Sequence, residues 1–462
     1  MRLQTAIQNH PGREWISWTV LTDAIDPLAC IEMTDEQDLH YWEQPEESFA
    51  IAAGGSVARL QATGPDRFNS ISEQARVLRE RHLHLSDIPH SLASPILPGG
   101  YSFSDHNIEK QWKGFGAARF TLPEWVLTRS GNLYMLTLSI RRENRSAGEL
   151  AAELLEHADR FHRLCRKVRD SGTGKNGNAV RSSTLTLQSK STWKEWERQV
   201  EQARQMIRKE AFQKIVLARQ LEAVSAHAIN IPHALYHFRH RFPGCFNFMI
   251  RTDEGTAFMG TSPERLVSLN SRRILTEGLA GSTARGESAV EDLTLGQELM
   301  ASKKERSEHR FVVEDIRNSL ASWTRRVNHP DEPLLKKLNN VQHLYTPISA
   351  EAEREISIHQ LVGSLHPTPA VGGFPREKAI PHITSIESLD RGWYAGPVGW
   401  FNLAGNGEFA VAIRSALVNG TRARLYAGSG IVRDSDPERE WQETIIKLRP
   451  VLEAIKTFEY EG

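Results

Sequence analysis

Hydrophobic and polar positions follow two different periods along this chain. Apolar residues recur at helical spacing in three segments, 148–168, 193–210 and 231–242, which predicts amphipathic helices. Short runs rich in branched and aromatic residues predict strands at 48–60, 133–140, 212–224, 246–252, 256–262, 265–270 and 272–278. Because several strands follow one another without intervening helices, the pattern indicates a mixed α/β (α+β) fold with antiparallel pairing rather than alternating βαβ units.

One segment interrupts this pattern. Residues 166–191 read RKVRDSGTGKNGNAVRSSTLTLQSKS, which is rich in Gly, Ser, Asn and Lys and poor in apolar residues. Such a composition is typical of a polar connection. We therefore expect an N-terminal part, 1–190, that ends in this linker, followed by a region from 191 to 462. No chemical motif stands out before the linker.

The last predicted helix carries a chemically suggestive face. Asp436 can cap it and Pro437 can occupy its first position. Glu440, Glu443 and Lys447 then lie at i, i+3 and i+7, so that two carboxylates and an ammonium share one side. That arrangement suits a metal and anion site, and it is equally typical of an ordinary solvated face with Glu-to-Lys pairing.

Composition narrows the possible environments and partners. Lys plus Arg and Asp plus Glu both number 57, so no overall charge favours nucleic acid or a membrane surface. The N-terminus lacks the apolar core of a signal peptide, and no apolar stretch is long enough to span a bilayer. Cys30, Cys165 and Cys245 lack CxxC spacing, which argues against a disulfide framework and a structural zinc site. We expect a cytoplasmic protein.

Three further residues could carry chemistry. Lys214 shares a strand face with apolar neighbours, where desolvation would favour a neutral amine that can act as a base, although it could equally extend to water. Glu264 follows a tight turn and could be a general acid, although Ser-Pro-Glu is common in turns. Glu308 could supply a hard oxygen ligand or be an ordinary solvated carboxylate.

The ordered set of motifs from about 190 to 455 resembles the chorismate-utilising enzymes, and among them the menaquinone-type isochorismate synthases. The motifs are KIVLAR at Lys214, GTSPERLV at Gly260, LAGSTARG at Leu279, EH at Glu308, QHLYTPI at Gln342, LHPTPAVGGFP at Leu365, RGWYAGPVGW at Arg391, GEFAVAIRSALV at Gly407 and AGSGIVRDSDPEREWQETIIK at Ala427. The first 165 residues match only weakly.

The resemblance implies a compact fold with two packed antiparallel sheets surrounded by helices. It also implies a Mg²⁺-dependent reaction in which water adds at C2 of chorismate and the C4 hydroxyl leaves. By correspondence, Lys214 would be the general base and Glu264 the general acid. Glu308 and Glu443 would ligate Mg²⁺, and Glu440 would do so directly or through water.

The same correspondence assigns substrate contacts. Tyr394 and Arg414 would contact the enolpyruvyl carboxylate, and His343 would form a polar wall. The remaining substrate-binding positions are Leu279, Ala280, Gly428, Gly430 and Lys447. Two departures from the family pattern, Gly278 and Ser282, bear on the specificity of the loop after 278. The two carboxylates of chorismate explain why a protein without net charge would gather cations in one cleft.

Several activities fit these residues. We expect an isochorismate synthase that feeds menaquinone or a catecholate siderophore. We expect it to be a monomer whose partner is the small molecule chorismate, with neither nucleic acid nor a membrane as partner. The alternatives are a salicylate synthase, which also eliminates pyruvate, and a catalytically silent chorismate-binding protein. Anthranilate synthase is disfavoured because Leu279-Ala280 stands where aminating members have Pro-Ile-Ala, and aminodeoxychorismate synthase because Ala280 replaces that group's lysine.

Overall fold

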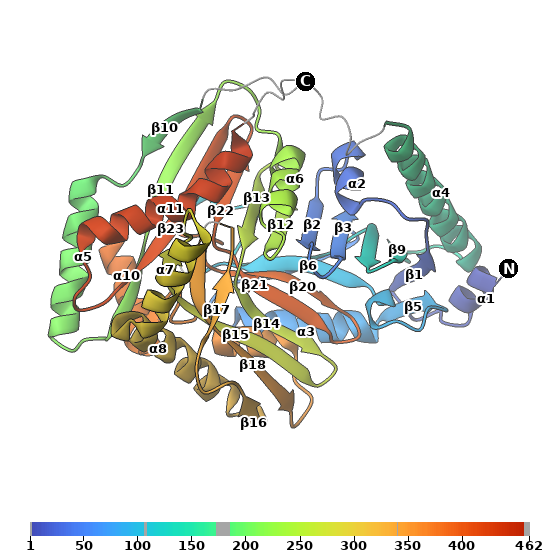
Figure 1. Ribbon diagram of the computed structural model, residues 1–462. Coiled ribbons are helices and arrows are strands. Elements are labelled where there is room, and N and C mark those ends of the chain that lie inside the picture. The colour runs from blue at the N-terminus through green and yellow to red at the C-terminus, as the bar shows by residue number, and fades with distance from the viewer. Residues whose placement is uncertain (1, 106–108, 172–184, 340, 457–462) are drawn as a thin grey trace.

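Two large sheets form the framework of the protein, and a shared apolar core lies between them (Figure 1). The computed structural model describes residues 2–105, 109–171, 185–339 and 341–456. The core includes Leu217 and Phe258 of the larger sheet and Phe120 and Phe409 of the smaller one. The predicted fold class, with two sheets surrounded by helices, is therefore confirmed.

The larger sheet contains thirteen strands in the described ranges. Their spatial order is β10 (Leu185–Ser189), β11 (Lys214–Ser225), β23 (Arg422–Ile431), β22 (Ser415–Asn419), β13 (Ala257–Ser262), β12 (Phe246–Arg251), β2 (Leu39–Gln44), β3 (Phe49–Gly54), β8 (Trp125–Ser130), β9 (Leu133–Arg141), β1 (Trp15–Leu21) and β5 (His82–Ser86), with β19 (Gly373–Phe374) beside β11. Neighbours pair antiparallel except β1 and β5, which are parallel.

The smaller sheet has ten strands in the same described ranges. They run in the order β16 (Thr324–Asn328), β18 (Val341–Ala352), β15 (Arg273–Ala284), β14 (Arg265–Asn270), β21 (Gly407–Val411), β20 (Pro397–Asn402), β6 (Ile96–Tyr101), β7 (Ala118–Leu122) and β4 (Ala58–Ala62), with β17 (Leu334–Lys337) beside β18. The run predicted as one strand at 48–60 is split between the sheets as β3 and β4. Gly55, at φ +73°, provides the turn between them.

Helices cover the outer faces of both sheets (Figure 1). They are α1 (Arg2–Gln8), α2 (Pro27–Met33), α3 (Arg67–Glu80), α4 (Ala147–Ser171), α5 (Trp193–Arg208), α6 (Ile231–Arg241), α7 (Ala289–Ala301), α8 (Lys303–Leu320), α9 (Ile358–Leu365), α10 (Arg376–Ile386) and α11 (Pro437–Ile455). Asp436 caps α11 as predicted, because its side chain accepts a hydrogen bond from the backbone N–H of Arg439 at 3.0 Å. None of the helices in the described ranges combines the length and apolarity needed to cross a bilayer.

Regular structure enters the segment predicted as a linker, 166–191, from both sides. α4 continues through Ser171, because Val168 still packs into the core, and β10 pairs with β11. Residues 172–184 of the prediction lie outside the described residues. Backbone pairing explains the strand, since it needs no apolar side chains. Strands from both sides of this segment enter both sheets, so the chain forms one unit.

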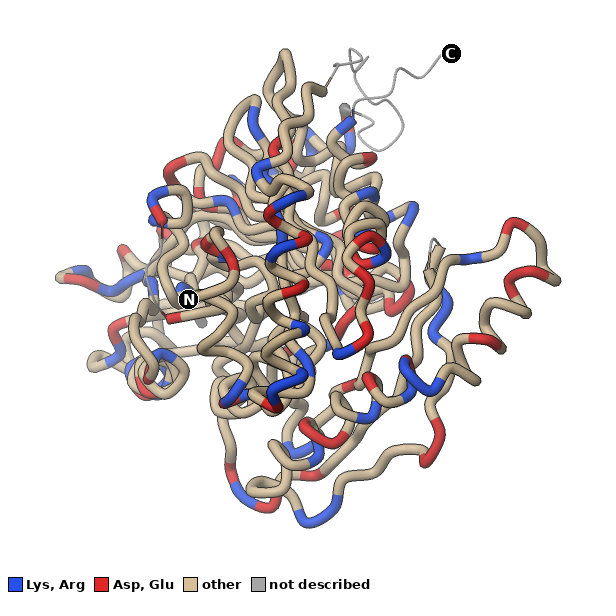
Figure 2. Tube along the Cα trace, turned by 90° about the vertical axis from the view of Figure 1, so that its left-hand side faces the viewer, with Lys and Arg blue, Asp and Glu red and all other residues tan. Residues whose placement is uncertain are grey.

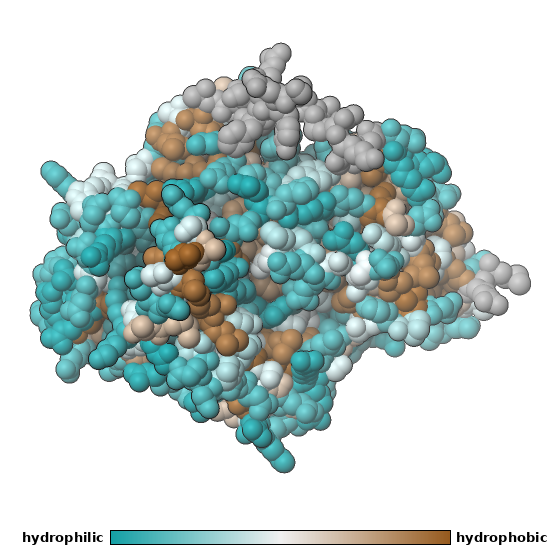
Figure 3. Space-filling model, in the orientation of Figure 1, coloured by the Kyte–Doolittle hydropathy of each residue, from teal (hydrophilic) through white to brown (hydrophobic). Residues whose placement is uncertain are grey.

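The surface carries mixed charge. Figure 2 shows Lys and Arg interspersed with Asp and Glu along one side of the molecule. Figure 3 shows a largely hydrophilic face with apolar side chains gathered over α7, where Val290 and Leu293 are exposed.

Candidate active site

One cavity collects the candidate residues from segments far apart in the sequence. Strands β11, β15 and β23 and helices α8 and α11 contribute to its wall. Twelve of the thirteen predicted site residues line it: Glu264, Leu279, Ala280, Glu308, His343, Tyr394, Arg414, Gly428, Gly430, Glu440, Glu443 and Lys447. Lys214 lies behind the wall at only 1% exposure and reaches the cavity through Glu308.

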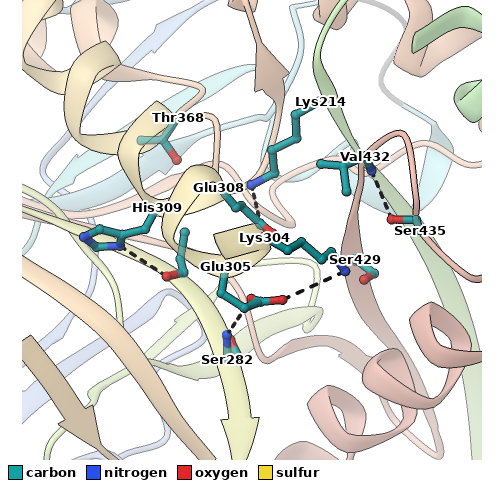
Figure 4. A network of polar contacts seen from close by, with 12 residues as sticks. Lys214, Ser282, Lys304, Glu305, Glu308, His309, Thr368, Ser429, Val432 and Ser435 are labelled. Atoms are coloured by element: carbon teal, nitrogen blue, oxygen red, sulfur yellow. Dashed lines mark hydrogen bonds and ion pairs between the residues drawn. The ribbon is translucent and has the colours of Figure 1, made fainter. Parts of the chain in front are cut away.

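Acidic side chains from α8 and α11 meet at one end of the cavity, which we call the carboxylate end (Glu305, Glu308, Glu440 and Glu443). All four lie within ion-pair distance of a lysine, Glu305 at 3.9 Å from Nζ of Lys304. The Nζ–Oε1 distances are 2.6 Å for Lys214 and Glu308, 2.7 Å for Lys447 and Glu443, and 3.7 Å for Lys304 and Glu440. Figure 4 shows Lys214 and Glu308 pointing toward each other from β11 and α8. The lysines balance much of the negative charge.

A buried hydroxyl joins two of these carboxylates. Oγ of Ser429, on β23, lies 2.5 Å from Oε2 of Glu440 and 2.8 Å from Oε2 of Glu443. A hydroxyl has one proton, so it donates to one of these two oxygens at a time. Through these two contacts Ser429 holds both acidic side chains of α11 against the sheet.

Glu305 is the site residue that the sequence interpretation missed. It lies one helical turn before Glu308 on α8, and its Oε2 accepts from the backbone N–H of Ser282 at 3.3 Å (Figure 4). Burial, and then the charge of Glu308, raise the pKa of Glu305 to about 6. The i, i+3 spacing of Glu305 and Glu308 repeats that of Glu440 and Glu443, and this was the available signal.

The donors at the carboxylate end fit a hard divalent cation. Carboxylate oxygens are the preferred ligands of Mg²⁺. Burial and the neighbouring carboxylate raise the pKa of Glu440, so an added cation would favour its ionised form. Gly430 leaves room here, since a Cβ would lie 2.9 Å from Oε1 of Glu308. In the described part of the chain no three such side chains already converge to ligand distance, because the lysines hold them apart.

Glu264, between β13 and β14, lines another part of the cavity. Its side chain is 3% exposed, and the hydroxyl of Thr368 donates to its Oε1 at 3.4 Å. Burial first, and then the charge of Glu277, raise the pKa of Glu264 from 4.5 to about 8. The carboxyl is therefore protonated at neutral pH and able to donate a proton.

Arg414 provides a buried positive charge on the same wall. It is 5% exposed and adopts a left-handed backbone conformation at φ +50°, a strained state that is common at functional sites. Its Nη1 has no hydrogen-bond partner among the described residues. Because a buried, unpaired guanidinium is costly, the geometry favours an anionic ligand at this position.

His343 links Arg414 to the loop after β15's bulge. Arg414 donates from Nη2 to Nε2 of His343 at 3.1 Å, and Nδ1 of His343 lies 2.7 Å from Oγ of Ser282. Since arginine can only donate, His343 carries its proton on Nδ1. Burial, followed by the charge of Arg414, keeps the pKa of His343 well below its usual range. The histidine is a neutral polar wall, and the hydroxyl of Ser282 orients it.

Backbone and small residues complete the wall. Lys447 donates to the carbonyl of Gly428 at 3.0 Å, and a Cβ at Gly428 would lie 3.1 Å from the Tyr394 hydroxyl. Tyr394 stacks on Tyr426 with ring centroids 5.2 Å apart. Ala280 accepts through its carbonyl from the buried His309 beside it, at 3.2 Å.

Comparisons with known proteins agree with this geometry. The family model described as "Chorismate binding enzyme" matches residues 1–456. Isochorismate synthase MenF of Bacillus subtilis is 35% identical over 95% of this chain and 93% of its own length. The salicylate biosynthesis isochorismate synthase of Pseudomonas aeruginosa is 37% identical over 94% and 88%. The structure of MenF, the menaquinone-specific isochorismate synthase from Escherichia coli, superposes with a TM-score of 0.79 at 27% identity, covering 98% of this chain and 100% of that one.

Proposed function

The chain belongs to the chorismate-binding enzyme family, and we propose that it is an isochorismate synthase, which adds water at C2 of chorismate and releases the C4 hydroxyl. The observation that carries this proposal is that one cavity contains both the buried carboxyl of Glu264, whose pKa is raised to about 8, and the buried guanidinium of Arg414, whose Nη1 has no partner among the described residues. A hydroxyl leaving group needs a proton, and a dicarboxylate substrate needs buried cations.

Glu264 and Lys214 would divide the proton transfers. Glu264 would protonate the departing C4 hydroxyl, and Lys214 would take a proton from the attacking water. Nζ of Lys214 lies 2.6 Å from Oε1 of Glu308, which brings the proposed base next to a proposed metal ligand.

The remaining residues would bind the two carboxylates of the substrate. Arg414 and Tyr394 would hold the enolpyruvyl carboxylate, with neutral His343 as a hydrogen-bonding wall. Glu308 and Glu443 would hold Mg²⁺, with Glu440 and Glu305 close by. When bound, Mg²⁺ would supply positive charge for the ring carboxylate.

The cellular setting is also part of the proposal. Isochorismate would feed menaquinone or siderophore synthesis, and the similar Escherichia coli enzyme is described as menaquinone-specific. We propose a cytoplasmic monomer, and the three buried, free thiols support a reducing compartment. The region 191–462 would be catalytic, since every cavity-lining residue lies between 216 and 447. Light scattering of the purified protein would test the monomer.

Product analysis tests the activity. The protein is incubated with chorismate and Mg²⁺, with and without ammonium or glutamine, and the products are separated by chromatography. We expect isochorismate to approach equilibrium with chorismate, independent of the nitrogen source. Salicylate and pyruvate formed in equal amounts, in proportion to enzyme, would instead identify a salicylate synthase. Unchanged chorismate would identify a silent binding protein.

A further inference from the structure

A second buried glutamate, Glu277 on β15, lies next to the general acid without lining the cavity. It is 4% exposed, although nothing in the proposed reaction uses it. Its Oε1 accepts two hydrogen bonds, from the backbone N–H of Arg265 at 2.9 Å and from Nζ of Lys336 at 3.1 Å. These two donors satisfy the hydrogen-bonding capacity of that buried oxygen.

Lys336, on β17, completes the arrangement. Its Nζ also donates to the carbonyl oxygen of Pro263 at 2.9 Å. The residues immediately before and after Glu264 are thus both tied to one ion pair, Glu277–Lys336. The turn is attached in this way to β15 and β17, two strands that come from later parts of the chain.

We propose that the Glu277–Lys336 pair is a positioning device for the general acid, which holds residues 263–265 so that the Glu264 carboxyl faces the cavity and remains ready to donate its proton. The proposal rests on the proposed function, because it takes Glu264 as the proton donor. Glu277 and Lys336 do not touch the substrate. They act through the turn and through their charges.

Glu277 and Lys336 have opposite effects on the pKa of Glu264, so an experiment can distinguish their contributions. Glu277 raises the pKa of Glu264, whereas Lys214 and Lys336 lower it, and burial is the largest influence. Arg414, which also lines the cavity, interacts with the Glu264 carboxyl as well. Removing Glu277's charge should therefore lower the pKa of Glu264, and removing Lys336's charge should raise it.

The experiment measures the alkaline limb of the pH–kcat profile. Glu277→Gln keeps an oxygen that can accept from Arg265 but removes the charge, so the limb should move to lower pH. Lys336→Met should move it to higher pH. Glu277→Ala, which also removes the acceptor, should in addition lower kcat by roughly tenfold, because a loosened acid is misplaced. The KM for chorismate should change little in each variant.

Glu408→Gln is the matched control. Glu408 is also buried and ion-paired, with Oε1 2.8 Å from Nε of Arg265, but it is not among the main influences on the pKa of Glu264. Glu408→Gln should lose as much folding stability as the other variants, but the midpoint of the alkaline limb of the pH–kcat profile should not change. Shifts in the same direction for Glu277→Gln and Lys336→Met, or no shift in either folded variant, would overturn the proposal.

A second readout does not depend on catalysis. Infrared difference spectra against Glu264→Gln follow the protonated Glu264 carboxyl directly, and the two variants should displace its titration in opposite directions. If these displacements occur in a protein that makes no isochorismate, the proposed function fails, and only the coupling of the Glu277–Lys336 pair to the Glu264 carboxyl stands. If isochorismate forms but the displacements are absent, the positioning role fails alone.

Discussion

Glutamates in two parts of the cavity wall differ in their pKa values. In one part, Glu264 is a single carboxyl enclosed by strands, and burial raises its pKa to about 8. At the carboxylate end, glutamates on α8 and α11 face lysines at distances as short as 2.6 Å. Burial raises the pKa of Glu305 and Glu440, whereas at Glu443 burial is outweighed by the charge of Lys447 and by hydrogen bonds, and the pKa is lowered. The surroundings, rather than the residue type, separate the acid from the candidate metal ligands.

Placement in the fold explains the difference. Glu264 follows a strand in the interior, where no cation lies within ion-pair distance among the described residues. The carboxylate end is built on two helices, and the long side chains of Lys304 and Lys447 reach it from the rim. A protonated donor and a cation-binding cluster can therefore share one small cavity.

The largest expected loss of activity comes from removing divalent cations from the carboxylate end. Treatment with EDTA followed by gel filtration should abolish turnover of chorismate, because four crowded carboxylates require a divalent cation to organise them. Excess Mg²⁺ should restore it, while circular dichroism shows that the fold is unchanged throughout. Full turnover by metal-free protein would remove the metal role from Glu308 and Glu443.

Lys214→Ala should come next, with a loss of about two orders of magnitude in kcat, the usual scale for a positioned base. Chorismate binding should persist, because Arg414 and Lys447 are intact. Lys190→Ala is the control, since Lys190 also pairs with a buried glutamate of β11, Glu222 at 2.9 Å, but lies outside the cavity. Near-normal kcat in Lys214→Ala would exclude the base role.

The raised pKa of Glu264 should make the stability of the protein depend on pH. Folding raises the pKa of Glu264 from 4.5 to about 8, so the folded state holds a proton that the unfolded chain releases. The stabilisation from this group is complete below pH 4.5 and is lost as pH rises to about 8. The free energy of unfolding of wild type, relative to Glu264→Gln, should fall across that window. A constant difference in urea unfolding would contradict the buried, protonated acid.

The smallest expected effect is a change in Mg²⁺ affinity at the carboxylate end. Ser429→Ala removes the hydroxyl that holds Glu440 and Glu443, and Mg²⁺ binding should weaken by about tenfold, as is typical when a group supporting metal ligands is lost. Isothermal titration with Mg²⁺ alone measures this directly. Ser17→Ala, which removes an equally buried hydroxyl far from the cavity, should bind Mg²⁺ as wild type does.

Much of the fold and of the candidate site follows from local sequence. Periodicity predicted α4 and α5 closely and placed Glu440, Glu443 and Lys447 on one face of α11, where they do line one cavity. Helix capping at Asp436 was equally predictable. These features depend on neighbours within one or two turns, so a single segment contains the necessary information.

Other features depended on contacts that no single segment contains. The pairing of Lys214 with Glu308, the Arg414–His343–Ser282 chain and the recruitment of Glu305 join side chains far apart in the sequence. The strand at 185–189 was hidden by its polar composition, because backbone pairing with β11 forms it. The sequence by itself determined which faces carry carboxylates, lysines and caps, since those depend on local geometry. Only the tertiary structure decided which of these groups are buried, paired or protonated, because the packing of the two sheets sets the distances between their charges and the extent of their desolvation.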